Sequence, residues 1–496
     1  MVNAATGFQH SLVALGSEYI TPTSATPVSA PDWIAWNDSL ASELGWPDAW
    51  SHTEEALAGL AGNTPFDGSQ PAASVYAGHQ FGSYNPQLGD GRALLLGEWH
   101  TPAGHVLDIQ LKGAGPTPYS RGGDGRSPVG PVVREYLVSE AMHALGVPTT
   151  RALAAVATGD PVYRQTREPG AILTRVADSH LRIGTIQFFA MTRRGAGLED
   201  IVNYATERHY GTALAAARDQ EPDVTPARVL LEEVGKALAG LVAQWQSIGF
   251  IHGVLNTDNM LLCGQTVDYG PCAFMDAFAA GRVFSSIDSG GRYAFGNQPG
   301  IVHWNLGVLA QCLLPLIDDD EEAAVAYAQA SVDRFPERFS SAYAAHLAAK
   351  FGLAGMREDD KQLIEQFFQQ LEQDSLDFTL AFRWLAEMAN GTLEQTPLSQ
   401  IFSPSDGLSD WCEQWQLRRK GASGDTTTRM LAVNPVVIPR NHLVARAIAA
   451  AEQGDYGVLK TLNSRWQDPF AWSDNDLQFA AAPEPEEAVH RTFCGT

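Results

Sequence analysis

The residues best suited to chemistry lie in two short segments near the middle of the chain. One reads His-Gly-Val-Leu-Asn-Thr-Asp-Asn from His252 to Asn259, and an Asp-Tyr-Gly triplet begins nine residues later at Asp268. Asn259 and Asp268 carry the oxygen donors that Mg²⁺ and Mn²⁺ prefer, and these ions commonly bridge the phosphates of a nucleotide. Asp258 adds a carboxylate beside Asn259 and is a candidate proton acceptor. The two segments therefore predict metal-assisted chemistry on a nucleotide.

The order of these residues matches the catalytic loop of protein kinases, His-Arg-Asp-Leu-x-x-x-Asn followed by Asp-Phe-Gly. Asn259 and Asp268 fall at its two metal-ligand positions. Lys112 at the end of a predicted strand and Glu135 on the next predicted helix match the kinase Lys–Glu ion pair. These four residues follow the same order along the chain as in protein kinases. We therefore expect two lobes with a nucleotide bound between them.

Val254 departs from the kinase pattern, because it occupies the position of the Asp that accepts the proton of the substrate hydroxyl. A valine side chain cannot accept a proton. Either the fold has lost catalysis or it carries out a different reaction with another base, for which Asp258 is the nearest carboxylate. A base needs reach as well as a suitable pKa, so the sequence leaves its role open.

Basic residues and glycines gather in the segments that precede this loop. Between Lys112 and Arg194 there are 11 Lys and Arg against six acids, although the whole chain has a formal charge of −24. Glycines let backbone N–H groups approach phosphate oxygens, and Arg binds phosphate through a bidentate fork. The chain contains neither G-x-x-x-x-G-K-[ST] nor G-x-G-x-x-G, so the usual P-loop and dinucleotide motifs are absent. The pattern predicts a pocket for a small polyanion, with three glycine-rich segments: 89–92, 112–115 and 121–126.

Composition limits the classes of function. The chain has 496 residues, 45% of them hydrophobic, which excludes global disorder. Its 57 acids against 33 Lys and Arg oppose binding to nucleic acids or anionic membranes. We expect no secretory signal at the start of the chain, and the five cysteines form no C-x-x-C pair. We expect a cytoplasmic monomer with neither a nucleic-acid nor a membrane partner.

Apolar periodicity predicts the elements that hold these residues. We expect strands at 93–99, 106–112, 152–157 and 171–176, and helices at 131–145, 229–248, 302–317, 321–332, 361–371 and 442–451. The apolar spacing of Trp33, Trp36, Leu40 and Leu44 predicts a further helix after Pro31. The expected fold is α+β and two-lobed like a protein kinase. Its parts are an N-terminal extension (1–68), a mixed nucleotide-binding lobe (69–185), a helical lobe with the catalytic and metal-binding loops (186–400), and a C-terminal region with one helix (401–496).

Longer motifs carry a resemblance to a known family. They are Y-A-G-H-Q-F-G from Tyr76, N-P-Q-L-G-D-G-R ending at Arg92, Q-L-K-G-A-G-P-T-P-Y-S-R-G-G-D-G-R from Gln110, H-G-V-L-N-T-D-N-M from His252, D-Y-G-P from Asp268 and N-P-V-V-I-P-R-N-H from Asn434. These residues resemble the selenoprotein O family, also called YdiU, of kinase-like protein adenylyltransferases. The resemblance runs from about residue 69 to the C-terminus.

This resemblance implies that ATP binds in a flipped orientation, and that AMP passes to Ser, Thr or Tyr hydroxyls of proteins while pyrophosphate leaves. UMP transfer from UTP with Mn²⁺ is also associated with the family. Carried over by position, the implied nucleotide-binding residues are Gly89, Gly91, Arg92, Lys112, Asp124, Gly125, Arg175, Arg182 and Asp268. Glu135 would pair with Lys112, Asn259 and Asp268 would bind Mg²⁺ or Mn²⁺, and Asp258 would be the catalytic proton acceptor.

Eukaryotic members of the family carry selenocysteine near the C-terminus, and Cys494 is similar in position. Cys272 follows the Asp268 triplet closely. We hypothesise that Cys272 and Cys494 form a redox pair that controls access to the site. The alternative is two reduced thiols that never meet.

Three functions remain open at this point. The first is the protein nucleotidyltransferase, the second a catalytically inactive pseudokinase scaffold that binds nucleotide, and the third a small-molecule phosphotransferase. Val254 favours the scaffold, whereas intact Lys112, Glu135, Asn259 and Asp268 oppose it. An Asp258→Ala enzyme should lose transfer while still binding nucleotide, but a scaffold should lose nothing.

Overall fold

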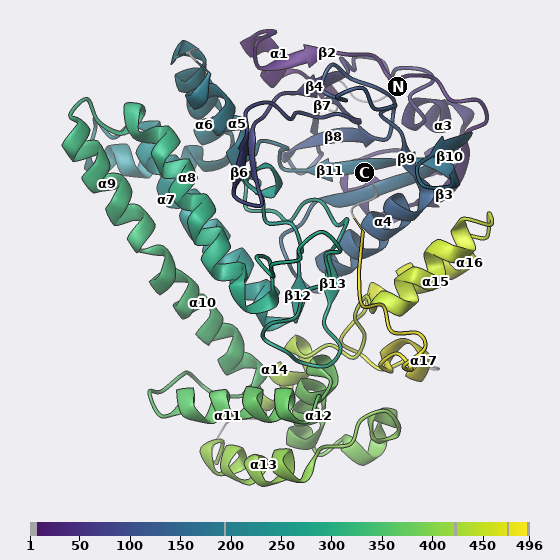
Figure 1. Ribbon diagram of the computed structural model, residues 1–496, viewed down its shortest axis with the longest axis vertical. Coiled ribbons are helices and arrows are strands. Elements are labelled where there is room, and N and C mark those ends of the chain that lie inside the picture. Colours follow the sequence, from purple (N-terminus) through teal and green to yellow (C-terminus); the bar gives the residue numbers. More distant parts are fainter. Residues whose placement is uncertain (1–6, 193–194, 421–423, 474–475, 494–496) are drawn as a thin grey trace.

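The computed structural model describes residues 7–192, 195–420, 424–473 and 476–493. A twisted sheet from the first third of the chain lies at one end, and helices from the remainder form the other (Figure 1). The protein is thus a mixed α+β structure.

The main sheet has the strand order β2-β4-β7-β8-β11-β10-β3, and all of its paired strands are antiparallel. Two short strands join it at the side, since β1 pairs with β7 and β9 with β11. Its strands are β1 (Phe8–Gln9), β2 (Ile20–Pro22), β3 (Asp32–Trp36), β4 (Ala72–Ser74), β7 (Ala93–His100), β8 (Val106–Lys112), β9 (Ser127–Pro128), β10 (Arg151–Tyr163) and β11 (Arg167–Ala177). The four strands predicted at 93–99, 106–112, 152–157 and 171–176 are confirmed.

Both faces of this sheet are buried, so β7 contributes apolar side chains to a core on each side. On β7, Leu95 points into the core shared with helix α4 (Val129–Ala144), whereas Leu94 and Leu96 point into the opposite core. That second core is closed by α2 (Asp38–Glu43) and α3 (Glu54–Leu60), with Trp46 between them. Successive side chains on a strand alternate between faces, so each face receives every second residue.

The predicted helix after Pro31 is wrong in its first part. Residues 32–36 form β3, which pairs with β10 through Trp36–Ala154 and Ala35–Ala155. Asn37 then ends the strand, because its side chain accepts a hydrogen bond from Leu40 N at 3.1 Å and starts α2. The spacing of the apolar residues fits a helix, but a free edge of β10 offers pairing that sequence periodicity cannot detect.

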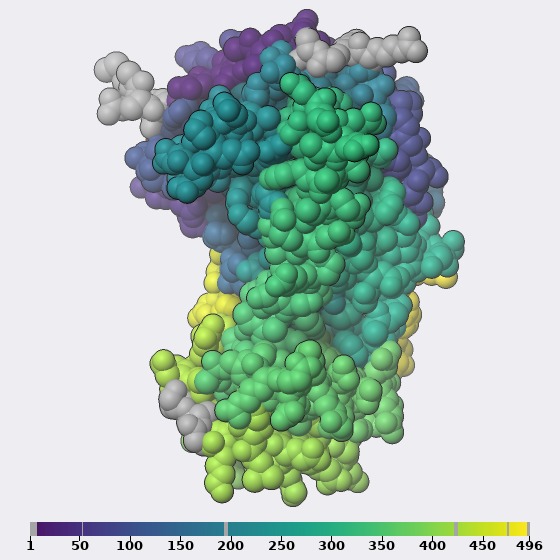
Figure 2. All heavy atoms as spheres, turned by 90° about the vertical axis from the view of Figure 1, so that its left-hand side faces the viewer, coloured from purple at the N-terminus to yellow at the C-terminus, as the bar shows by residue number. Residues whose placement is uncertain are grey.

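The helical part confirms the predicted helices at 229–248, 302–317, 321–332 and 361–371, with small shifts of their ends, and adds others. Its helices are α5 (Ile183–Met191), α6 (Gly195–Gln220), α7 (Pro226–Ser247), α8 (Gln298–Ile317), α9 (Glu321–Asp333), α10 (Phe335–Lys350), α11 (Asp360–Gln373) and α12 (Phe378–Asn390). α7 lies at the centre and packs against α6, α8 and α10. Figure 2 shows the green helices of this part running from the sheet region toward the residues after 400.

The C-terminal region is richer in helices than predicted. Besides the expected helix α15 (Asn441–Ala451), it contains α13 (Asp406–Arg418), α14 (Gly424–Val433), α16 (Gly457–Trp466) and α17 (Leu477–Ala480). α15 and α16 pack against α4, and α14 packs against α10 and α12. Arg440, fully buried, pairs with Asp377 at 2.8 Å and with Asp276, which ties this region to the helical part. The prediction of only one helix in this region was therefore wrong. The other helices are stabilised by packing against distant elements, which local sequence patterns do not reveal.

Five short elements complete the description of the site region. β5 (Gly78–Gln80) and β6 (Ser83–Asn85) form a hairpin, and β12 (Phe250–Ile251) pairs with β13 (Ala273–Phe274). Thr257–Asn259 form the 3₁₀ turn η2. Within the described chain, one segment, Phe295–Ile317, is long and apolar enough to cross a membrane, but half of its most apolar window is buried inside the protein, as in a core helix.

Candidate functional site

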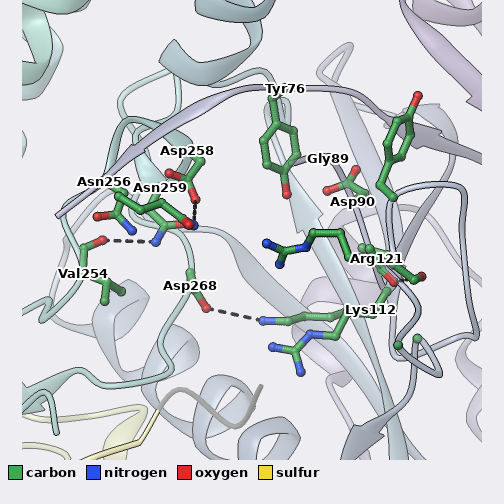
Figure 3. A pocket seen from close by; sticks show the side chains of 18 of the residues that line it. Tyr76, Gly89, Asp90, Lys112, Arg121, Val254, Asn256, Asp258, Asn259 and Asp268 are labelled. Carbon is green, nitrogen blue, oxygen red and sulfur yellow. Dashed lines mark hydrogen bonds and ion pairs between the residues drawn. The ribbon is translucent and has the colours of Figure 1, made fainter. Parts of the chain in front are cut away.

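A cavity of about 450 Å³ lies between the sheet and the loops around η2. Figure 3 shows Asp258, Asn259 and Asp268 on one side of it and Lys112, Arg121 and Gly89 on the other. Most of the predicted site residues line this single cavity: Gly89, Gly91, Arg92, Lys112, Asp124, Gly125, Arg175, Arg182, Asp258, Asn259 and Asp268. The fold thus brings together residues that lie far apart in the sequence.

Glu135 lies behind the cavity wall and organises two of its cations. Lys112 Nζ donates to Glu135 Oε2 at 2.5 Å, and Arg175 Nε donates to Oε1 at 2.7 Å. Lys112 ends β8, Arg175 is on β11 and Glu135 is on α4, so sheet and helix meet at this group. Burial acts to raise the pKa of Glu135, but Arg175 and Lys112 lower it below its usual range. The predicted Lys112–Glu135 ion pair is therefore formed.

Asp268 faces Lys112 across the cavity at 3.6 Å. Burial acts to raise the pKa of Asp268, but Lys112, Arg175 and other cations bring it down to about 2. Its carboxylate is therefore ionised at neutral pH. Asp268 has φ of 66°, a left-handed conformation that is uncommon for a residue with a side chain and is enriched at functional sites.

Asn259 is oriented by the loop that carries it. Its Nδ2 donates to the carbonyl of Val254 at 3.1 Å, so the amide nitrogen is used within the protein and Oδ1 remains for a ligand. No group of three His, Cys, Asp or Glu side chains gathers as a metal site in the parts of the chain that the structure describes. A pair such as Asn259 and Asp268 fits Mg²⁺ nevertheless, since this ion commonly takes one or two protein oxygens and completes its shell with phosphates and water.

Asp258 is buried in η2, with 6% of its surface exposed. Its Oδ2 accepts a hydrogen bond from Gln80 Nε2 at 3.2 Å, whereas its buried Oδ1 has no partner among the described residues. Burial raises the pKa of this carboxyl, and the nearby Arg182 opposes the rise. Asp258 lines the cavity, while its unpartnered Oδ1 is packed against Gly78. The carboxylate therefore keeps hydrogen-bonding capacity that the protein does not use.

Arg182 connects the two sides of the cavity. Its Nη1 donates to the backbone carbonyl of Asp258 at 2.6 Å, and its Nη2 lies 3.5 Å from Asp90 Oδ1. The guanidinium also lies 4.3 Å from the centre of the Tyr76 ring. Because Arg182 immediately precedes α5, this one side chain fixes the position of η2 relative to the loop at 89–92.

Two glycines of the predicted phosphate loops are required by geometry. Gly89 has φ of 87°, and a Cβ there would lie 2.5 Å from the Tyr119 ring. Gly125 has φ of 65°, and a Cβ there would lie 2.0 Å from the carbonyl oxygen of Gly115. The neighbouring Asp124 is largely exposed and pairs with Arg164 at 2.9 Å. The glycine-rich segment is therefore folded back on itself at the edge of the cavity.

Several cavity residues were not among the predicted site residues. They are Tyr76, Gln80, Phe81, Asp90, Tyr119, Ser120, Arg121, Gly123, Arg126, Arg164, Asn256 and Ile287, together with Ala93 and Val254. Arg121 and Arg126 flank the glycines of a predicted phosphate loop, and this position could have identified both of them as site residues from the sequence. Tyr76 and Gln80 belong to a quoted motif, but only the tertiary structure brings the β5–β6 hairpin against Asp258.

Cys272 is buried behind the cavity and does not line it. Burial raises the pKa of its thiol to about 12, and Sγ contacts the Tyr269 carbonyl at 3.2 Å. Cys494 lies outside the described residues, so the pairing of these cysteines stays a prediction. Thr492 approaches the region, because its hydroxyl donates to the carbonyl of Pro271 at 2.5 Å.

Comparisons with known proteins agree with this site. Residues 3–467 match the family model described as protein adenylyltransferase SelO. A protein nucleotidyltransferase YdiU from Bacillus mycoides is 45% identical over 492 residues, covering 98% of each chain. Proteins of the same name from Rhodopseudomonas palustris and Anoxybacillus flavithermus are each 46% identical, covering 99% and 100% of both chains, respectively. The chain belongs to the SelO family, to which the sequence motifs had already pointed.

Proposed function

We propose that the protein is an enzyme that transfers AMP from ATP to Ser, Thr or Tyr hydroxyl groups of proteins and releases pyrophosphate. The observation that carries this proposal is the convergence, in one cavity, of phosphate-binding cations, a pair of metal-type oxygen donors and a buried carboxylate with one free oxygen. Membership of the SelO family and the name shared by its relatives support the same activity.

The proposed architecture is that of a protein kinase. Residues 69–185 would form the nucleotide-binding lobe and residues 186–400 the helical lobe, with extensions at 1–68 and 401–496. The Lys112–Glu135 ion pair beside a sheet, and the Asn259 and Asp268 pair on the facing loops, support this division. Strands β2 and β3 from the first extension belong to the same sheet, so that extension would be integral to the lobe.

In the proposed reaction, the hydroxyl oxygen of the acceptor attacks the α-phosphorus of ATP, the bond from this phosphorus to the bridging oxygen breaks, and pyrophosphate leaves. The carboxylate of Asp258, which lines the cavity, accepts the hydroxyl proton. Arg92, Lys112, Arg175 and Arg182 hold the phosphates and neutralise their charge. Mg²⁺ or Mn²⁺ would supply additional charge stabilisation when bound. Because these groups are fixed in advance, little reorganisation is needed during the reaction.

A base at Asp258 is consistent with the absence of one at Val254. Attack at the α-phosphate rather than the γ-phosphate moves the reacting centre, so the base need not occupy the kinase position. The scaffold alternative rests on Val254 alone, and no observation on the cavity favours it. An inactive scaffold would not need several features of this cavity, namely Asp268, the Lys112–Glu135 pair and the unpartnered oxygen of Asp258.

Label transfer to protein from ATP labelled at the α-phosphate, compared with ATP labelled at the γ-phosphate, tests the proposal. Incorporation from the α-position alone, abolished by Asp268→Ala, is the expected result. Label from the γ-position alone would mean that the protein is a kinase. Competition by UTP in the same assay distinguishes AMP from UMP transfer, which the wider name nucleotidyltransferase leaves open.

A further inference from the structure

Exposed apolar side chains gather at the mouth of the cavity. In the described ranges eight large hydrophobic residues are exposed, and three of them, Tyr84, Ile287 and Trp304, belong to the region around the cavity, with 40%, 58% and 39% of their surface exposed. Ile287 lines the cavity directly. Tyr84 is on the β5–β6 hairpin, whose residues Gln80 and Phe81 also line it.

The aromatic residues of this surface are arranged by the hairpin. The ring of His79 lies 5.2 Å from that of Tyr84 and 5.2 Å from that of Trp304 on α8. Figure 1 shows β6 running between the sheet and α8. The hairpin therefore links the cavity to the exposed rings of Tyr84 and Trp304.

Arg292 adds a positive charge to this surface. Its guanidinium lies 5.1 Å from the centre of the Trp304 ring, and a Cβ on Gly82 at the hairpin tip would lie 3.6 Å from it. Among the described residues the Arg292 guanidinium forms no ion pair, although the Asp288 carboxylate accepts a hydrogen bond from the Arg292 backbone N at 2.9 Å, and Nε is buried without a hydrogen-bond partner. A second hollow of about 450 Å³, lined by Arg292, Gly296, Asn297, Gly300 and Ile301, adjoins it. The chain has a formal charge of −24, so a cation that forms no ion pair within it is unusual. Such a cation is suited to bind a carboxylate of another molecule.

The surface is coupled to the catalytic loop through Tyr293. Its hydroxyl donates to Asn256 Oδ1 at 2.5 Å and accepts a hydrogen bond from Phe81 N at 3.1 Å. Asn256 lies two residues before Asp258. A molecule bound over Arg292 would therefore sit on the same rigid group of residues that positions the proposed base.

The size of the cavity places the acceptor outside it. A volume of about 450 Å³ is typical of a site for one small molecule, so a bound nucleotide leaves little room for a polypeptide. Only the acceptor side chain can enter, and the residues that flank it must contact the surface at the mouth.

We propose that Tyr84, Ile287, Arg292 and Trp304 form an acceptor surface, which binds an extended segment of the protein substrate and selects a large apolar side chain and an acidic residue next to the modified hydroxyl. This proposal rests on the proposed function and names the substrate feature that the site recognises. The apolar side chain packs on Trp304 and Tyr84, while the carboxylate pairs with Arg292.

Synthetic peptides test this specificity. Each carries one Ser, Thr or Tyr, flanked by Asp, Ala or Lys on one side and Leu or Ala on the other, and label transfer from α-labelled ATP is measured. We expect the Asp/Leu peptides to have a KM about tenfold below that of the Lys/Ala peptides, in line with one partly buried ion pair and one apolar contact. Arg292→Glu should reverse the preference between Asp and Lys peptides, and Trp304→Ala should raise the peptide KM about tenfold with little change in the KM for ATP.

Matched controls are Arg446→Glu on α15 and Leu417→Ala on α13, both exposed and outside the cavity lining. Neither should alter the peptide preference. Equal KM values for all peptides, or a preference that survives Arg292→Glu, would overturn the acceptor surface while leaving the proposed function intact. So would label transfer to proteins of a cell extract with none to any peptide, because the surface would then not bind a linear segment. Absence of Asp268-dependent transfer to any protein would instead overturn the proposed function.

Discussion

The amine of Lys112 lies 3.6 Å from the carboxylate of Asp268, although the two residues come from a strand of the sheet and from a loop in the helical half of the chain. The same amine donates to Glu135 at 2.5 Å. Lys112 thus contacts two carboxylates: Glu135, which holds it in place, and Asp268, which is suited to bind a metal ion. A substitution of either carboxylate should therefore alter the position of Lys112 in the cavity.

Asp268→Ala should abolish label transfer, with a decrease of about 10²–10³-fold or more, because it removes a metal-type ligand and the partner of Lys112. Chelation of divalent ions should have the same effect on the unaltered protein, and added Mg²⁺ or Mn²⁺ should reverse it. Label transfer at constant ATP, with and without chelator, provides the measurement. Full activity of the variant in the presence of chelator would contradict the assignment of Asp268.

Asp258→Ala and Asp258→Asn should both reduce kcat by about 10²–10⁴-fold while leaving ATP binding nearly unchanged, because the lost group accepts a proton rather than holding the nucleotide. Calorimetric ATP titration and label transfer on the same preparations separate the two effects. Asp48→Ala, which removes an exposed carboxylate far along the chain from η2, is the control. A variant that loses ATP binding in parallel with transfer would assign Asp258 to nucleotide binding.

Gly125→Ala should raise the KM for ATP by about tenfold or more, because its Cβ would lie 2.0 Å from the carbonyl oxygen of Gly115 and distort the loop. Gly122→Ala is the matched control. Gly122 also has a left-handed φ, of 83°, but a Cβ there would meet nothing within 4 Å. Its substitution should cost only about 1 kcal/mol of backbone preference. Equal effects of the two variants on the KM for ATP would show that close packing of the loop is irrelevant.

Lys350→Met should stabilise the protein, and more so at low pH. Lys350 is buried in α10 over the Phe382 ring, at 4.2 Å, and burial lowers its pKa from 10.5 to about 7. His346, one turn earlier, is the titratable neighbour, and burial alone accounts for the lowered pKa of Lys350. The unfolded chain therefore binds the Lys350 proton more tightly than the folded chain. The destabilisation of the folded protein by Lys350 is fully present below about pH 7, decreases as the pH rises, and disappears near pH 10.5.

Urea unfolding near pH 6.5 and near pH 9.5 measures this effect. The gain from Lys350→Met should be a few kcal/mol at the lower pH and clearly smaller at the higher one. Lys361→Met, at a lysine with 67% of its side chain exposed, should show no such pH dependence. A gain independent of pH would mean that Lys350 is not the titrating group.

Oxidation should link Cys272 to Cys494 if the redox hypothesis holds. Because burial raises the pKa of Cys272 to about 12, we expect slow reaction of its thiol until the loop around it opens. Nonreducing mass mapping after mild oxidation, with Cys272→Ser as control, detects the crosslinked peptide. Its absence, with both cysteines recovered as free thiols, would refute the hypothesis.

The sequence by itself determined the cavity residues that are best suited to chemistry. Lys112, Asn259 and Asp268 follow the order of a known catalytic pattern, and the glycine-rich segments at 89–92 and 121–126 retain their meaning in isolation, because backbone freedom and charge are local properties. The apolar run in β7 and the alternation of apolar and polar residues in β8 likewise predict strands without knowledge of their partners.

Only the tertiary structure decided the remainder. Residues 32–36 became a strand because β10 offered a free edge, and α13, α14 and α16 formed against distant surfaces that no local pattern records. The partners of Asp258, from Gln80 on the β5–β6 hairpin to Arg182 before α5, depend on loops that close over long stretches of chain. Spacing in a sequence specifies which groups are available. Folding alone decides that one oxygen of Asp258 and the Nε of Arg292 are left without a hydrogen-bond partner while the groups around them are satisfied.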